Sequence, residues 1–348
     1  MKTYLFCLAA ASALLVASAA CNKEKGVYVA GYQENDDGKK IATLWKNGSP
    51  IQYTDSGTDA TAHSLFVTAK EVFMAGELKN ELGNTVATLW VGTVPLRQSD
   101  GSSSSTLHAV FVNGDDWYAT KNEIDSATSK TEVAYLVSNQ IVQRLGDGKT
   151  NSESHGIFVS GNDVYIAGAQ YNSDDKRTVA TLWKVGKDGV ETKQLPSGKS
   201  NAWAKSVFVD GNNIYVAGEE YDAKGKWTAV YWKNGERKAL GDGVSDSHAV
   251  SICYSDGTLY IAGSNKSIQG KDIAILWENS SANALSNTMV DGQAFSVFVF
   301  KNDVYVAGVE KNSDGFRVAT LWKNKDPENP QRLGSQNRDS CAYAVFVR

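Results

Sequence analysis

Short apolar segments alternate with polar turns along almost the whole chain. One five-residue pattern, apolar–Tyr/Phe–apolar–Ala–Gly, occurs seven times, at spacings of 45, 45, 47, 50, 45 and 45 residues. The third copy is degenerate and reads Trp117-Tyr118-Ala119-Thr120. The copies begin at Val27, Val72, Trp117, Val164, Ile214, Leu259 and Val304. Periods of this length, with several short strands in each unit, are typical of β-propellers and solenoids.

Each unit contains four predicted strands. Strand A corresponds to residues 64–67, strand B is the five-residue pattern, strand C ends in Ala-Thr-Leu-Trp or a variant of it, and strand D is a short segment such as 237–240. Turns rich in Gly, Asn and Asp join A to B and C to D, and longer polar loops join B to C. Because these links are short, the strands pair as antiparallel hairpins.

Two repeated positions show how the units pack together. Strand A begins with a small residue in all seven units, and its third position is phenylalanine in six of them, with Cys253 as the exception. A strand that carries only a small side chain at one position is predicted to lie innermost, where neighbouring blades converge and leave little space. Tryptophan at the end of strand C recurs in six units, which predicts a core between blades, and Val137 replaces it in the third unit.

The ends of the chain predict how the ring closes. The strand A expected before Val27 would fall in the N-terminal segment, and a spare strand A lies at residues 344–347. We expect this last segment to pair with residues 27–31, because closure removes exposed strand edges. The predicted fold is an all-β, seven-bladed β-propeller of residues 27–348, with four antiparallel strands per blade and a ring closed by the C-terminal strand.

The repeat resembles two known groups of proteins. The strand order, with tryptophan ending strand C, is similar to WD-repeat and kelch-like propellers. The stretch Ala-x-Leu-Trp-x-Asn-Gly-x-x-x-x-Leu, seen in a variant form at residues 229–240, resembles the HAF-type repeat of bacterial extracellular proteins. This resemblance implies a secreted propeller, and it does not imply any single activity.

The N-terminus predicts export and membrane anchoring. An apolar run at residues 4–17 follows Lys2 and is too short to span a membrane as a stable helix. It ends in Ser18-Ala19-Ala20-Cys21, which resembles a lipobox, although Ser18 stands where leucine is more common. We expect a signal peptide at 1–20, lipidation of Cys21 and a tether at 21–26. The alternative is ordinary cleavage after Ala20.

These features predict a lipoprotein of the outer membrane or cell surface, with the periplasmic leaflet as an alternative. Five residues separate Cys21 from Val27, so the face with the tight turns is expected to lie near the bilayer. The net charge of −4 and the pI of about 5.7 do not indicate the basic surface of a nucleic-acid-binding protein. Cys253 and Cys341 align to distant positions of the repeat and are predicted to be free thiols.

All four histidines fall at related positions near the start of strand A, on the face with long, variable loops. Variable loops on a rigid scaffold are where binding residues concentrate. We therefore predict a ligand-binding channel mouth, and the alternative is that the histidines are structural, as in WD-repeats. The predicted mouth residues are His63, His108, His155, Lys205, His248, Phe295, Tyr343, Trp203, Glu153 and Gln293.

Other motifs add little specific chemistry. Trp203 and Trp227 break the repeat and are interpreted as ligand contacts on the same face. The Asp- and Asn-rich loops lack the spacing of a calcium site and are interpreted as ordinary turns. No metal or other cofactor is predicted, because the histidines lie on diverging blades and have no carboxylate partner at a fixed spacing.

The sequence leaves three functions open. The first is a monomeric, non-enzymatic module that binds a glycan, a peptide or an envelope protein, with no catalytic residues. The second is a carbohydrate-active hydrolase or lyase. Hydrolysis needs two carboxylates, and only Glu153 is predicted at the mouth, since Glu219, Glu220 and Glu310 are interpreted as solvated loop charges. A lyase would use Tyr343 and a histidine as acid and base. The third is a structural subunit of an envelope complex.

Overall fold

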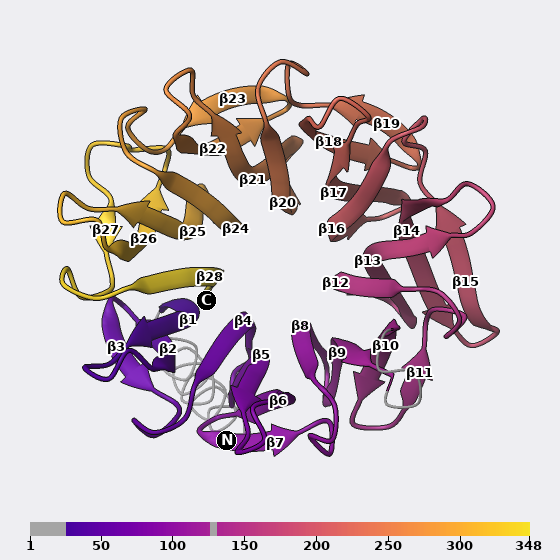
Figure 1. Ribbon diagram of the computed structural model, residues 1–348, viewed down its shortest axis with the longest axis horizontal. Helices are drawn as coiled ribbons and strands as arrows, with labels where there is room; N and C mark the ends of the chain where they lie inside the picture. The colour runs from indigo at the N-terminus through magenta and orange to yellow at the C-terminus, as the bar shows by residue number, and fades with distance from the viewer. Residues whose placement is uncertain (1–25, 126–130) are drawn as a thin grey trace, which may run out of the picture.

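The computed structural model describes residues 26–125 and 131–348, which form seven four-stranded antiparallel sheets around a central axis (Figure 1). This confirms the predicted fold. The innermost strands are β4 (Ala60–Val67), β8 (Ser105–Asn113), β12 (Ser152–Ser160), β16 (Asn201–Asp210), β20 (Ser247–Ser255), β24 (Gly292–Phe300) and β28 (Ser340–Val347). The second strands are β1 (Val27–Glu34), β5 (Val72–Lys79), β9 (Asp116–Ile124), β13 (Asp163–Asn172), β17 (Asn213–Tyr221), β21 (Thr258–Lys266) and β25 (Asp303–Lys311).

Two further strands complete each blade toward the rim. The third strands are β2 (Lys40–Lys46), β6 (Thr85–Val91), β10 (Glu132–Ser138), β14 (Arg177–Gly186), β18 (Trp227–Lys233), β22 (Asp272–Glu278) and β26 (Arg317–Lys323). The outer strands are β3 (Ser49–Gln52), β7 (Val94–Arg97), β11 (Val142–Arg144), β15 (Gly189–Gln194), β19 (Glu236–Ala239), β23 (Ser281–Ala284) and β27 (Gln331–Arg332). No helix in the described part of the chain is long and apolar enough to cross a membrane.

The C-terminal strand closes the ring as predicted. β28 pairs with β1 from Val27 opposite Val347 to Gln33 opposite Ser340, and Gly26 and Arg348 exchange backbone hydrogen bonds of 2.9 and 3.0 Å. The first blade is thus built from both ends of the chain (Figure 1). The proposed signal, Cys21 and the tether up to Lys25 lie outside the described residues.

The six strand-C tryptophans form the core between blades, as predicted. All six are completely buried, and the residue in the third blade, Val137, is also buried. The tryptophans are Trp45, Trp90, Trp183, Trp232, Trp277 and Trp322.

The small residue of each inner strand lies where the next blade comes closest. Ser64 Oγ accepts a hydrogen bond from the backbone N–H of Val110 in the following blade, at 3.2 Å, and Ser206, Ser251 and Ser296 bond the following blade in the same way. A Cβ atom on Gly156 would lie only 2.7 Å from the Cα of Ser206. Neighbouring blades therefore approach too closely for a large side chain at this position.

A second link between blades is a polar residue that lies four residues before His63 and before its equivalents in the other units. Asp59 precedes β4 of the second blade, where its carbonyl accepts the N–H of Lys79 in β5, and its Oδ1 accepts the N–H of Lys40 in β2 of the first blade. The sequence analysis missed this repeated polar residue. Its equivalents are Ser104, Asn151, Asn201, Asp246, Asp291 and Asp339.

The inner strands begin earlier than predicted and contain a β-bulge. In the second blade, β4 starts at Ala60 rather than Ser64, and the register shifts between Ala62 and Ser64, so that His63 is the extra residue. All seven blades have the same shift at the same repeat position. A bulge redirects a side chain out of the regular alternation of a strand. The structure therefore places the predicted histidines within the inner strands and not before them.

The glycine that ends the five-residue pattern lies opposite this bulge. A Cβ atom on Gly218 would be 2.1 Å from the carbonyl oxygen of Trp203 and 2.9 Å from the ring of Trp232. In the third blade, Lys121 replaces the glycine, Thr120 replaces the alanine before it, and Val137 replaces the tryptophan. There Thr120 Oγ1 accepts the N–H of Ala109 at 3.0 Å. The degenerate copy is thus a paired change, in which a larger residue at the glycine position accompanies the smaller Val137 at the tryptophan position.

Six phenylalanines form a belt around the inner strands, toward the end with the tight turns. Neighbouring ring centroids are 4.7–5.2 Å apart, from Phe298 through Phe346, Phe66, Phe111 and Phe158 to Phe208. Cys253 occupies the seventh position of this belt. As predicted, Cys253 and Cys341 are free thiols, and burial raises their pKa to about 11 and about 12.

Candidate functional site

The seven bulge residues define a ring within the central channel, which we call the bulge ring. Each is partly exposed, although the strands around it are largely buried. Most other repeat positions keep one type of residue, and this one varies from blade to blade. The members are His63, His108, His155, Lys205, Val250, Phe295 and Tyr343.

Aromatic side chains of the bulge ring contact one another across blades. The ring centroids of Phe295 and Tyr343 are 5.2 Å apart, those of Tyr343 and His63 5.5 Å, those of His63 and His108 5.9 Å, and those of His108 and His155 5.7 Å. The structure thus brings together five of the ten predicted mouth residues as a continuous arc, the aromatic arc.

Three carboxylates lie around this arc. His63 Nε2 is 3.8 Å from Glu77, and Glu77 also accepts a hydrogen bond from Thr106. His155 Nε2 is 3.3 Å from Glu153 but is buried without a well-aligned hydrogen-bond partner. The predicted partner Glu153 is therefore at the mouth, and Glu77 is an acidic residue that the sequence analysis missed.

Glu219 is the most connected of the three carboxylates. His248 Nδ1 donates to it at 2.7 Å, and Lys205 Nζ lies 3.3 Å away. The side chain of Glu219 is only 11% exposed, so the prediction of a solvated loop charge was wrong.

The same prediction was wrong for Glu220 and Glu310. Both are buried within β17 and β25, where Arg237 and Arg332 pair with them at 2.7 and 2.5 Å. A sequence signal existed for the two mouth carboxylates that were not predicted there. Glu77 and Glu219 each follow the glycine of the repeat pattern, directly opposite Thr61 and Trp203 of the inner strand.

The surroundings of these groups lower the pKa of two of the histidines and of all three carboxylates. Burial, together with the neighbouring histidines and Lys205, holds the pKa of His108 well below its usual value, and burial and Lys205 lower that of His155. His155, Lys205 and Trp203 lower the pKa of Glu153, and the polar partners of Glu77 and Glu219 outweigh burial and lower their pKa. At neutral pH this part of the mouth therefore combines ionised carboxylates with the neutral imidazoles of His108 and His155.

An aromatic cluster stands beside Glu219. Trp227 has its ring centroid 5.4 Å from Trp203, 4.8 Å from Tyr221 and 5.4 Å from His248. These side chains come from β16, β17, β18 and β20, so two blades build the cluster. The structure places both repeat-breaking tryptophans together at the mouth. The remaining predicted residue, Gln293, donates to Asp272 at 2.9 Å on the far side of the ring.

No group of three or more His, Cys, Asp or Glu side chains with the geometry to hold a metal ion occurs among residues 26–125 and 131–348. The polar loops between second and third strands form turns closed by their own side chains, as in Asn35, whose Oδ1 accepts the N–H groups of Asp37 and Lys39.

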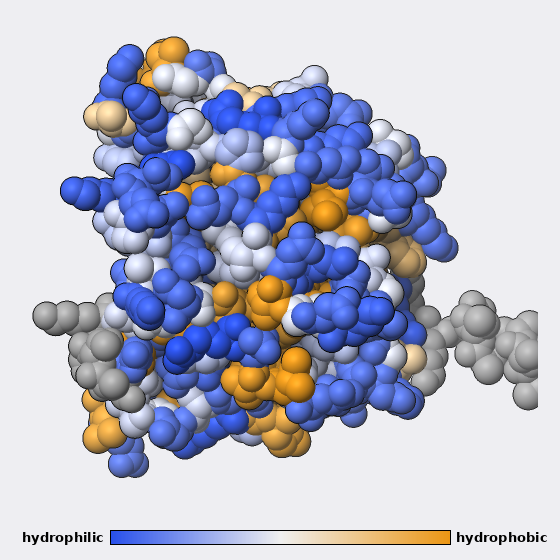
Figure 2. Space-filling view, turned by 90° about the vertical axis from the view of Figure 1, so that its right-hand side faces the viewer, coloured by the Kyte–Doolittle hydropathy of each residue, from blue (hydrophilic) through white to orange (hydrophobic). Residues whose placement is uncertain are grey.

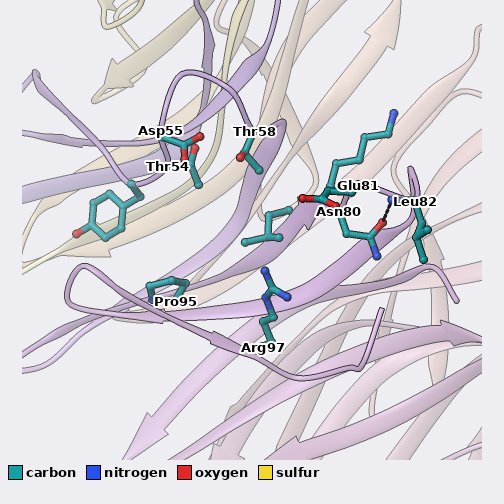
Figure 3. Close-up of a pocket in the computed structure, with 11 residues that line it drawn as sticks. Thr54, Asp55, Thr58, Asn80, Glu81, Leu82, Pro95 and Arg97 are labelled. Carbon is teal, nitrogen blue, oxygen red and sulfur yellow. Dashed lines mark hydrogen bonds between the residues drawn. The ribbon is translucent and has the colours of Figure 1, made fainter. Parts of the chain in front are cut away.

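A separate pocket of about 630 Å³ lies at the junction of blades 1 and 2 (Figure 3). Arg97 and Pro95 of β7 form one wall, facing Thr54, Asp55 and Thr58 from the preceding blade. Its charged residues balance one another, and most of its walls are exposed side chains. It therefore offers a less rigid surface than the mouth of the channel.

Comparison with known proteins supports the fold alone. No protein-family model matches the chain, and no curated protein matches it. Solved structures do. A puromycin-hydrolysing peptidase of Mycobacterium tuberculosis superposes with a TM-score of 0.60 at 12% identity, over 90% of this chain and 52% of the peptidase. The chain thus spans about half the length of that enzyme.

Two further structures show the same likeness. The β-propeller domain of the Trilobed protease from Pyrococcus furiosus, described as having an open velcro topology, gives a TM-score of 0.56 at 11% identity, over 91% of this chain and 96% of that domain. A post-proline cleaving enzyme from Rickettsia typhi gives 0.51 at 10% identity, over 91% and 52%. The protein is a seven-bladed β-propeller, and its own ring is closed by β28.

Proposed function

We propose that the protein is a membrane-anchored, non-enzymatic binding module whose channel mouth receives a glycan, a peptide or a partner protein. The observation that carries this proposal is the bulge ring. A position whose backbone geometry is the same in all seven blades carries five different types of residue, including those of the aromatic arc. A purely structural position would be expected to keep one residue type, as the core tryptophans do.

The charges at the mouth favour binding over acid–base hydrolysis. A glycoside hydrolase needs a protonated carboxyl group as its acid, and the pKa values of Glu77, Glu153 and Glu219 are all lowered. Burial also raises the pKa of Tyr343, which makes it a poor base for a lyase.

One observation favours an enzyme as the second candidate. Burial and the nearby charge of Glu153 raise the pKa of Glu132, whereas the pKa of Glu153 is lowered. The two carboxyl groups thus differ in the direction needed for a protonated acid and an ionised base. A hydrolysis assay within any ligand screen distinguishes the two functions.

A structural subunit would be expected to show a large apolar docking patch. The rim of the blades that carry β15 and β19 is mostly hydrophilic, with separate apolar patches (Figure 2). This side therefore gives no support to the third function.

The binding function predicts a specific loss of affinity. The purified protein is first screened against glycan and peptide arrays. The triple variant His63→Ala, His108→Ala, Trp203→Ala is expected to bind the ligands found at least tenfold more weakly, because it lacks the side chains that contact them at the mouth. The matched control is a truncation on the outer strand β11, Val142→Ala, which should leave affinity unchanged because Val142 is exposed away from the mouth. Ligands that bind both variants equally would place the site elsewhere.

We also propose that Cys21 anchors the protein to the outer membrane or cell surface. Gly26 pairs with Arg348 on the face with the tight turns, where Asn47 of the turn between β2 and β3 donates its N–H to the carbonyl of Val27. The Cys21→Ala variant is expected to lose incorporation of labelled palmitate and to leave the membrane fraction, since several acyl chains are needed for stable anchoring. Unchanged membrane association in this variant would contradict the proposal.

A further inference from the structure

We propose that the mouth recognises a cationic group, an ammonium or guanidinium on a basic peptide segment, between the aromatic cluster of blade 5 and the carboxylates Glu153 and Glu219. This inference rests on the proposed binding function and specifies its ligand class. The residues involved are Trp203, Trp227 and Tyr221 together with the two carboxylates.

The first argument is the balance of charge. Three carboxylates, Glu77, Glu153 and Glu219, face the sector of the mouth formed by blades 2 to 5. Lys205 pairs with Glu219 there, at 3.3 Å, and Lys40 acts on Glu77 through its charge. The nearby pair Lys121 and Glu123, 2.7 Å apart, neutralises itself. The carboxylates outnumber the lysines of the sector, and His108 and His155 add no charge at neutral pH, so the sector attracts a cation and repels an anion.

The second argument comes from the aromatic faces. Elsewhere the protein covers its own tyrosine rings with lysines, as with Lys40 over Tyr32 at 4.7 Å and Lys233 over Tyr215 at 5.3 Å. Among the described residues, no lysine or arginine lies over Trp203, Trp227 or Tyr221 in this way. Indole faces are the best cation–π acceptors, so these partly exposed rings are available to a cation from another molecule.

The third argument is the position of Glu153 and His155. The side chain of Glu153 is 33% exposed, which leaves it accessible, and Trp203 from the next blade contacts it. Beside it, the buried Nε2 of His155 has no aligned hydrogen-bond partner. A donor group entering between Trp203 and Glu153 would complete this polar arrangement, and a bound ammonium or guanidinium carries such donors.

The test compares three blocked tetrapeptides, of lysine, glutamine and glutamate, by isothermal titration calorimetry. The lysine peptide is expected to bind, and to bind more weakly in 500 mM than in 50 mM salt, because screening weakens the attraction. Glu153→Gln and Glu219→Gln should each weaken it about tenfold, and Glu191→Gln on the exposed β15 should not. Lys205→Met removes the internal competitor of the ligand and should strengthen binding severalfold.

The outcomes separate the two proposals. If the glutamine peptide or a neutral oligosaccharide binds equally well, and the Glu→Gln variants bind as the wild type does, the cationic ligand class is wrong and the binding module stands. If nothing in the array or the peptide set binds, both are wrong. Thermal melts of each variant, with the exposed Glu191→Gln as the reference, distinguish a lost contact from a lost fold.

Discussion

A chain that ends at Asp339 is expected to lose its folded ring. Without β28, the inner edge of β1 would expose the backbone groups that now pair from Val27 to Gln33. The core between the last and first blades would also lose Ala342, Val345 and Val347, which pack with Trp45. An exposed edge beside an opened core favours aggregation. Size-exclusion chromatography and a thermal melt of the truncated protein measure the effect.

Complementation provides the control for this truncation. A synthetic peptide of residues 340–348 is expected to restore the monomeric, cooperatively melting protein, and a scrambled peptide of the same composition is not. A truncated chain that melts like the full-length protein would show that closure by β28 contributes little to stability.

Gly218→Ala is expected to destabilise the protein by about 3 kcal/mol, at the upper end of what overpacking costs. The new methyl group would overlap the carbonyl oxygen of Trp203 and press on the ring of Trp232, both of which are fixed by the strands around them. The shift of the urea midpoint measures the loss. The matched control is Gly57→Ala, where the nearest atom to a Cβ is 3.7 Å away and the effect should be close to zero.

The third blade supplies a second control. There Lys121 and Val137 stand in place of the glycine and the tryptophan. Combining Gly218→Lys with Trp232→Val should therefore cost less than the sum of the two single changes, because the effects of substituting residues in contact are not additive. Strict additivity would argue against the interpretation of the degenerate copy as a paired change.

The spacing of the repeat predicted the blades, the inner position of the small residues and the buried tryptophans. These depend on local alternation and on a fixed distance along the chain, both of which are visible in one sequence. The bulge was not predicted, because its sequence signal is a single extra residue at the same place in every unit. As a result, His63 and its equivalents were placed before the strand and not within it.

The acidic residues of the mouth show a different limit. Glu219 and Glu220 are adjacent in the sequence and look alike there, yet Glu219 reaches His248 and Lys205 while Glu220 pairs with Arg237 toward the rim. Successive residues of a strand point to opposite faces, so the choice between mouth and core depends on register against β16. The sequence alone does not fix that register at a bulge.

The sequence by itself determined that this protein is a closed ring of seven blades, because repeated hydrophobic spacing and a displaced terminal strand leave few other ways to bury the core. The tertiary structure decided which side chains meet at the mouth. Glu153, Trp203, Trp227 and His248 belong to three different blades, and only the packing of those blades around one axis brings their charges and rings within contact distance.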